Sequence, residues 1–161
     1  MKRLALVLSL TCSVAACSAE EPMTSPGAAQ RSVLAAELEA KTTKIRLTIN
    51  GQSLTATLVD SSTTRDFVAL LPLTLTLDNY AFTEKIAYLP RKLSTQGAPA
   101  GIDPDVGDIT YYAPWGNLAI FYRDFGHSTG LIRLGHFEDG MEALQVSGSM
   151  NVTIEPVGKL P

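Results

Sequence analysis

Residues 126–130 have the sequence Gly-His-Ser-Thr-Gly, which matches the G-x-S-x-G pattern of a nucleophile elbow. In that motif a strand leads into the serine and a helix follows it, so the hydroxyl stands exposed at a sharp turn. Here residues 131–134 have the pattern of a strand, and His136 is the only histidine further along the chain. We therefore interpret the match as chance and expect the two glycines to serve a loop.

Two other groups of polar residues have types that bind metals. His127 and His136 lie nine residues apart, but no cysteine or local carboxylate pattern completes a site around them. Asp103, Asp105 and Asp108 form an acidic cluster, which misses the EF-hand pattern and suits turns beside proline and glycine. The sequence therefore predicts neither a metal site nor a cofactor.

Aromatic residues gather between residues 107 and 144. This stretch holds the only tryptophan, three of the five tyrosines and three of the five phenylalanines. Tyr111 and Tyr112 are neighbours on one expected strand, and Phe121 and Tyr122 are neighbours on the next. Because successive side chains of a strand point to opposite faces, one of each pair should fill the interior of the fold and the other should face outward.

The first residues have the character of a targeting segment. Lys2 and Arg3 precede an apolar run, residues 4–10, that is too short to span a bilayer as a helix. The sequence Val-Ala-Ala-Cys that ends at Cys17 looks like the lipobox of a bacterial lipoprotein. We expect residues 1–16 to be a lipoprotein signal peptide and the Cys17 thiol to carry the lipid, which would make the membrane a partner. The alternative is an ordinary secretory signal cut just before Cys17.

Residues 17–43 are expected to be the lipidated cysteine and a flexible tether. The segment is rich in Ala, Ser, Pro and Glu and has no aromatic residue, so it can bury little apolar surface. Within it, residues 32–41 have the spacing of a transient helix, although a flexible linker is the favoured interpretation. Ser18 resembles an outer-membrane sorting signal, which predicts a lipid-anchored protein of the bacterial cell envelope, in the outer membrane and facing the periplasm.

The charge of the chain argues against one class of partner, and its cysteine content argues against an internal disulfide. Removal of Lys2 and Arg3 with the signal changes the formal net charge from −3 to −5, and no run of basic residues remains. Nucleic acid is therefore not expected as a partner. A mature chain with one cysteine has no internal disulfide, so its stability must come from a hydrophobic core.

The predicted domain begins at residue 44 with a β-hairpin. Apolar residues alternate with polar ones on both sides of Asn50-Gly51, the strongest short hairpin signal, because both turn positions need a positive φ. A two-residue turn pairs Leu47 with Leu54, which places the apolar residues of both strands on one face.

The rest of the chain predicts short strands with two short helices. A helix is expected after the capping residues 60–64, with Phe67 on its apolar side and Pro72 at its end. Further strands are expected over residues 73–77, 85–89, 108–113, 118–123, 131–134 and 150–154, and a helical turn over 139–144. Residues 91–107 form the longest irregular segment. These elements predict an all-β fold, a closed antiparallel barrel of about eight strands with two short helices.

Two stretches resemble the cyclophilins. The sequence Gly-Met-Glu-Ala-Leu at residues 140–144, after a strand and a glycine, is similar to the end of a cyclophilin domain. Residues 107–124, with the sequence GDITYYAPWGNLAIFYRD, are similar to the small bacterial cyclophilin-like domain proteins. The resemblance covers residues 44–157 and implies a cyclophilin-like domain there.

Cyclophilins are peptidyl-prolyl isomerases, and the resemblance does not extend to their catalytic residues. When the proline that follows the family's arginine motif is aligned with Pro90, Ala87 stands where the arginine should be. Leu118 and Ile120 stand near the positions where the family has glutamine and phenylalanine. A preorganised donor is typically worth about 10²–10³ in rate, so we expect no catalytic residues and at most a weak isomerase.

The resemblance implies a lipid-anchored envelope protein that binds a peptide or a small ligand without catalysis. The alternatives are a weak peptidyl-prolyl isomerase of the envelope and a structural subunit that docks through the barrel. By likeness to cyclophilins, a shallow groove is expected to be lined by the candidate residues Tyr88, Leu93, Gln96, Tyr112, Trp115 and Tyr122. An equally weighted interpretation is that these rings only cover the outer face of the sheet.

Overall fold

The computed structural model describes residues 30, 31, 33 and 43–158. Gln30, Arg31 and Val33 are helical, whereas the expected signal peptide, Cys17 and most of the tether lie outside the described residues. In the described part of the chain, no helix is both long and apolar enough to cross a membrane.

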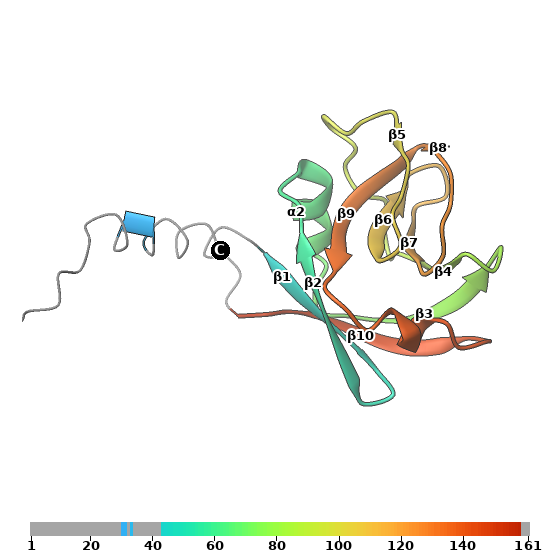
Figure 1. Cartoon of the computed structure of the whole chain (residues 1–161). Helices are drawn as coiled ribbons and strands as arrows, with labels where there is room; N and C mark the ends of the chain where they lie inside the picture. Colours follow the sequence, from blue (N-terminus) through green and yellow to red (C-terminus); the bar gives the residue numbers. More distant parts are fainter. Residues whose placement is uncertain (1–29, 32, 34–42, 159–161) are drawn as a thin grey trace, which may run out of the picture. The chain divides into compact units, whose positions relative to one another are not determined.

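Eight antiparallel strands close into a barrel in the order β1-β10-β3-β4-β7-β6-β9-β2, with β2 returning to β1, which confirms the predicted architecture (Figure 1). The strands are β1 (Lys44–Ile49), β2 (Gln52–Leu58), β3 (Leu73–Tyr80), β4 (Glu84–Tyr88), β6 (Asp108–Tyr112), β7 (Asn117–Phe121), β9 (Leu131–Phe137) and β10 (Met150–Pro156).

The β1–β2 hairpin has the predicted register. Leu47 pairs with Leu54, and the turn residues Asn50 and Gly51 have φ values of 48° and 81°. On its other edge β1 pairs with β10, where Leu47 lies opposite Ile154. The alternating apolar residues of all three strands therefore face the barrel interior.

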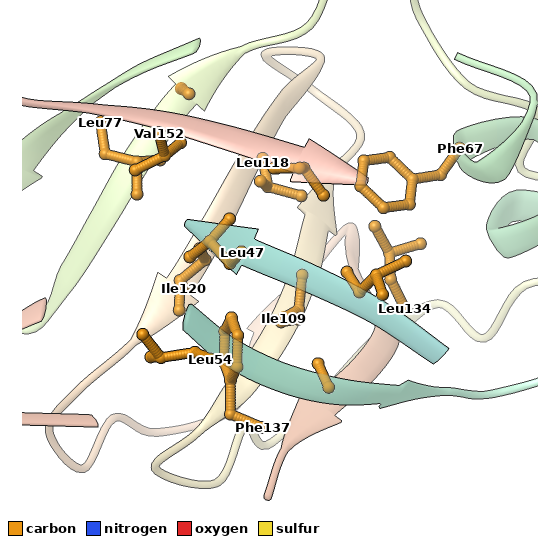
Figure 2. Close-up of a cluster of buried hydrophobic side chains, with 14 of the residues drawn as sticks. Leu47, Leu54, Phe67, Leu77, Ile109, Leu118, Ile120, Leu134, Phe137 and Val152 are labelled. Atoms are coloured by element: carbon orange, nitrogen blue, oxygen red, sulfur yellow. The ribbon is translucent and has the colours of Figure 1, made fainter. Parts of the chain in front are cut away.

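Helix α2 (Ser62–Val68) packs against the barrel and inserts one ring into it. Ser61 caps the helix by accepting a hydrogen bond from the Thr64 backbone N–H at 3.0 Å. The Phe67 side chain is fully buried, and Figure 2 shows it extending from the helix into the cluster that holds Leu118 and Leu134.

The helix ends earlier than the position of Pro72 predicts. Leu70 and Leu71 donate backbone hydrogen bonds to residues three positions earlier, so the chain tightens into a turn before the proline. A proline disfavours the helical conformation in the residue before it, which accounts for the early end.

Other elements differ in extent from the sequence prediction. Strands β3 and β9 each run three residues past their predicted ends. Within the described residues the second expected helix is a single 3₁₀ turn, η1 (Met141–Leu144), so the barrel carries one α-helix.

The long irregular segment contains a short strand, β5 (Gly101–Ile102), which pairs with β8 (Ser128–Thr129). The two backbones approach closely, because a Cβ atom on Gly101 would lie 2.4 Å from the Ser128 carbonyl oxygen. This two-stranded ladder joins the long segment to the loop that follows β7.

One charged side chain, Lys85, points into the barrel and is fully buried. Its Nζ donates hydrogen bonds to the carbonyl oxygens of Val146 and Gly148, each at 2.8 Å. Desolvation lowers the pKa of this ammonium group, and the nearby Asp78 carboxylate partly opposes the effect. Lys85 therefore ties β4 to the segment between η1 and β10.

We predict that Gly135→Ala destabilises the barrel where β2 pairs with β9. A Cβ atom at Gly135 would lie 2.5 Å from the Thr57 carbonyl oxygen and 2.6 Å from Leu58 Cδ2, so the strands would have to separate. Overpacking of this kind typically costs about 1–3 kcal/mol of unfolding free energy. Denaturant unfolding followed by circular dichroism measures the loss.

Gly126→Ala is the matched control, because no atom lies within 4 Å of the Cβ it would add. We expect its unfolding free energy to stay close to that of the parent chain. Equal losses in the two variants would show that close approach at Gly135 does not constrain the barrel.

Candidate functional site

A cleft with a volume of about 170 Å³ lies on the outer face of the barrel. Its floor is made by β4 and β7, which are hydrogen-bonded neighbours although they are not consecutive in the chain. In their register Glu84 lies opposite Phe121, and Ile86 lies opposite Ala119. Because these four residues alternate with interior ones, they all face outward into the cleft.

Aromatic rings from several elements form the walls. Trp115, in the turn between β6 and β7, makes edge-to-face contacts with Tyr80 at 5.4 Å and with Tyr112 at 5.5 Å between ring centroids. The interplanar angles are 88° and 79°. On the other side Phe121 packs against Phe125 of the following loop, with centroids 5.3 Å apart. All five rings border the same space.

Glu84 brings a carboxyl group into this apolar surrounding. The residue is 8% exposed, and the Thr83 hydroxyl donates a hydrogen bond to its Oε2 at 2.9 Å. Burial raises the pKa of the Glu84 carboxyl, and the hydrogen bond from Thr83 offsets part of that rise. Among the described residues Glu84 has no ion-pair partner.

Asn117 is a second buried polar residue of the cleft. It is 1% exposed, and its Nδ2 donates to the Leu118 carbonyl oxygen at 3.1 Å. Its Oδ1 has no hydrogen-bond partner among the described residues. Since almost all buried polar atoms in proteins are paired with protein groups or ordered water, this oxygen is an acceptor that a water molecule or a ligand can pair with.

The cleft thus combines apolar walls with buried hydrogen-bond acceptors. Ile86, Ala119 and Leu131 complete the apolar surface, and Ser128 adds a hydroxyl. No lysine, arginine or histidine is among the residues that line it. Apolar surface with a few convergent polar groups is the usual composition of a small-ligand site.

The six ligand-binding candidates from the sequence fall in different places. Tyr112 and Trp115 border the cleft, whereas Tyr88 is 65% exposed and lies outside its lining. Leu93 and Tyr122 pack into the main hydrophobic core.

Gln96, the sixth candidate, is exposed in the long segment, where its backbone carbonyl accepts a hydrogen bond from Ser62. The structure therefore brings together two of the six candidates. From the pair Phe121 and Tyr122, it is Phe121 that borders the cleft.

Tyr80, Glu84, Asn117 and Phe125 were missed by the sequence reasoning. One signal was available, because Glu84 shares its strand face with Ile86 and Tyr88, so a carboxyl group stands on an otherwise apolar face. The pairing of β4 with β7, which puts Glu84 and Asn117 on the same outer face of neighbouring strands, is not encoded in any local pattern.

Two arginines, Arg91 and Arg123, are close in sequence to residues that line the cleft, but neither is part of its lining. Arg91 makes an ion pair with Asp66 at 2.5 Å, and the same carboxylate accepts from the Ser94 backbone N–H at 2.7 Å. Hydrogen bonding by Arg91 lowers the pKa of Asp66. This pair fastens the start of the long segment to α2. Arg123 is exposed and is not part of the lining.

His136 and the acidic cluster form a separate network around Asp108, which is 1% exposed. Asp108 accepts from Arg133 Nε at 2.7 Å and lies 3.0 Å from His136 Nδ1. The Asp105 backbone N–H also donates to Asp108. The network supplies the buried Asp108 carboxylate with hydrogen-bond partners, and it holds the turn that leads into β6.

We predict that Glu84→Gln changes the pH dependence of stability. Because the pKa of Glu84 is raised above its ordinary value of 4.5, the folded chain holds a proton that the unfolded chain has released. The free energy of unfolding therefore falls as pH rises through this window, and the fall is complete above the raised pKa. Glutamine cannot ionise, so the variant gains stability relative to the parent chain as the pH rises from the ordinary carboxyl pKa of 4.5 through the raised pKa of Glu84.

Thermal unfolding of both chains across that range measures the difference. Glu155→Gln, which removes an exposed carboxylate from β10, is the matched control, and the gain of Glu84→Gln with rising pH should exceed that of this control. An equal pH dependence in the two variants would contradict the assigned burial of the Glu84 charge.

The chain is similar to known proteins in both sequence and fold. The model of the cyclophilin-like family matches residues 47–155, which reach from β1 to β10. The solution structure of a hypothetical protein from Archaeoglobus fulgidus matches with a TM-score of 0.53 at 19% sequence identity, over 71% of this chain and 94% of that one. No curated protein matches the sequence. The structural likeness concerns the fold alone, and the family match spans most of the barrel; the chain belongs to the cyclophilin-like family.

Proposed function

We propose that this protein is a lipid-anchored binding protein of the bacterial cell envelope, whose barrel holds a peptide or a small ligand in the outer cleft. The observation that carries the proposal is the pair of buried polar groups in one apolar cleft, the unpartnered Oδ1 of Asn117 at one end of the β4–β7 pair and the Glu84 carboxyl at the other. Buried polar groups without partners cost free energy, and a ligand that pairs with them recovers that cost.

Binding without catalysis is favoured over prolyl isomerisation. Cyclophilin isomerases use an arginine beside the substrate proline, and the residues that line this cleft include no arginine. Arg91, the nearest candidate, is engaged with Asp66. The Asn117 Oδ1 and the Glu84 carboxylate are acceptors, which suit recognition of a donor on the ligand rather than stabilisation of a twisted amide by a cation.

The anchor is proposed from the sequence around Cys17. The short apolar run and the small residues before the cysteine support lipidation there. Each buried methylene of an acyl chain contributes about 0.8 kcal/mol of membrane affinity, so a cysteine that carries several chains stays on the membrane. The tether would then allow the barrel to sample the space near the bilayer surface.

We predict that Cys17→Ser releases the protein from membranes. Serine offers no thiol for lipid attachment, so the variant should move from the membrane fraction to the soluble envelope fraction and lose labelling by radioactive palmitate. Cys12→Ser is the control, because Cys12 lies within the signal segment, and it should keep both properties. Membrane retention of the Cys17 variant would contradict the anchor.

We predict that ligands of the cleft are detected by the emission of Trp115, since the chain has no other tryptophan. The full-length chain in detergent is titrated with a library of short peptides and small polar molecules. For each ligand found, Trp115→Ala should weaken binding about tenfold or more in calorimetry, because a ring at the centre of an interface commonly dominates its affinity.

Phe82→Ala is the matched control. Phe82 is 76% exposed in the turn between β3 and β4 and is not part of the lining, so its loss should leave affinity unchanged. A library in which no member changes the emission of Trp115 at millimolar concentration would overturn the proposed binding function.

A further inference from the structure

We propose that the cleft selects a ligand that carries an alkylammonium group. This inference rests on the proposed binding function and names the chemistry that the site recognises. The polar groups, the aromatic walls, the charge and the size of the cleft each bear on it.

The buried polar atoms of the cleft call for a hydrogen-bond donor. Asn117 Oδ1 can only accept, and it is the orphaned atom at the floor. The ionised Glu84 carboxylate is also an acceptor, and it has a single hydrogen bond, from Thr83. Ser128 and the tyrosine hydroxyls can donate or accept, so they favour neither a donor nor an acceptor on the ligand. A primary ammonium group has three donors and no acceptor, so it suits either of these acceptors, which lie at opposite ends of the β4–β7 pair.

The charge of the site also favours a ligand with an ammonium group. A carboxylate removed from water is costly unless an opposite charge accompanies it, and no described residue supplies one to Glu84. Because no basic residue lines the cleft, the positive charge that balances Glu84 has to come from the ligand. The net negative charge of the chain adds a weak long-range attraction for cations.

The aromatic walls suit a cation. Trp115 packs edge-to-face against both Tyr80 and Tyr112, and all three rings border the cleft. Proteins hold ammonium groups against the faces of aromatic rings, because the ring face carries partial negative charge. Such contacts are stronger where the site is shielded from water, as at the floor beside Glu84.

The size of the cleft limits the ligand to a short chain. A volume of about 170 Å³ matches that of five or six water molecules at roughly 30 Å³ each. A short alkylammonium chain, such as butylammonium or the side chain of a lysine, fits in this space. The same chemistry is thus available from a free amine and from a lysine in a peptide.

A neutral amide is the competing ligand. If Glu84 were protonated it could donate to a carbonyl oxygen, and the amide N–H could pair with Asn117. A comparison of charged and neutral ligands of equal size separates the two cases, because only the charged ligand gains from an ionised Glu84.

The experiment uses the full-length chain in detergent at neutral pH, with Trp115 emission and calorimetry as readouts. Butylammonium is compared with 1-butanol, and Nα-acetyl-lysine methylamide is compared with its Nε-acetylated form. We expect at least one cation to bind tenfold or more tightly than its neutral counterpart. Preference for butylammonium identifies a free amine as the source, and preference for the lysine derivative identifies a peptide; either result supports the inference.

Two substitutions test the parts that Glu84 and Tyr80 play in binding the cation. Glu84→Gln should abolish the preference for the cation, whereas Glu155→Gln removes one exposed negative charge from β10 and should keep it. Tyr80→Leu retains an apolar wall but removes a π face, so it should weaken binding of the cation several-fold without weakening that of 1-butanol. Tyr80 is 41% exposed, which makes this variant independent of any folding defect in Glu84→Gln.

Equal affinity for the charged and neutral ligands, or tighter binding of the neutral ones, would overturn the inference and leave the proposed binding function standing. Failure of all four ligands to change Trp115 emission would also overturn it. The peptide and small-molecule library then decides separately whether the cleft binds anything.

Discussion

The closed ring of hydrogen-bonded strands is the constraint on which the rest of this structure depends. Each of the eight strands has a neighbour on both edges, so no strand can slip without breaking two ladders. Alternate residues are therefore committed either to the interior or to the outer face. This commitment holds Glu84 and Asn117 outward on adjacent strands, although both are buried.

Strand β7 shows how a barrel can bury residues on both of its faces. Leu118 and Ile120 enter the main core (Figure 2), while Ala119 and Phe121 form a second apolar cluster with Leu131 on the outside. This outer layer makes the cleft possible, because it excludes water from the floor. A strand with water on its outer face would leave Asn117 solvated and its hydrogen bonds satisfied.

Much of the fold could be predicted because its signals are local. Asn50-Gly51 and the alternation around it determine a register that the structure shows pair by pair. The ends of β3 and β9 were placed too early, because polar or small residues such as Asp78 and Gly135 continue a ladder once a neighbouring strand is present. Propensity alone cannot anticipate that support.

The candidate site was less accessible to the same reasoning. Tyr112 and Trp115 stand close together in the sequence within one hairpin, and both border the cleft. Glu84 lies 28 residues before Tyr112, and only the pairing of β4 with β7 reveals that it borders the cleft. Alternation also cannot say which of two adjacent rings faces outward when both faces of a strand are buried, and this is why Tyr122 and Phe121 could not be told apart.

The pairing of β5 with β8 has a mechanical consequence. Ser128 borders the cleft, and its backbone is clamped against Gly101 in the middle of the long irregular segment. The rim of the cleft is consequently joined by a two-stranded ladder to that distant segment. In the proposed binding function, the rate at which a ligand leaves would then depend in part on how stiffly residues 91–107 are held, including by the Asp66–Arg91 pair at their start.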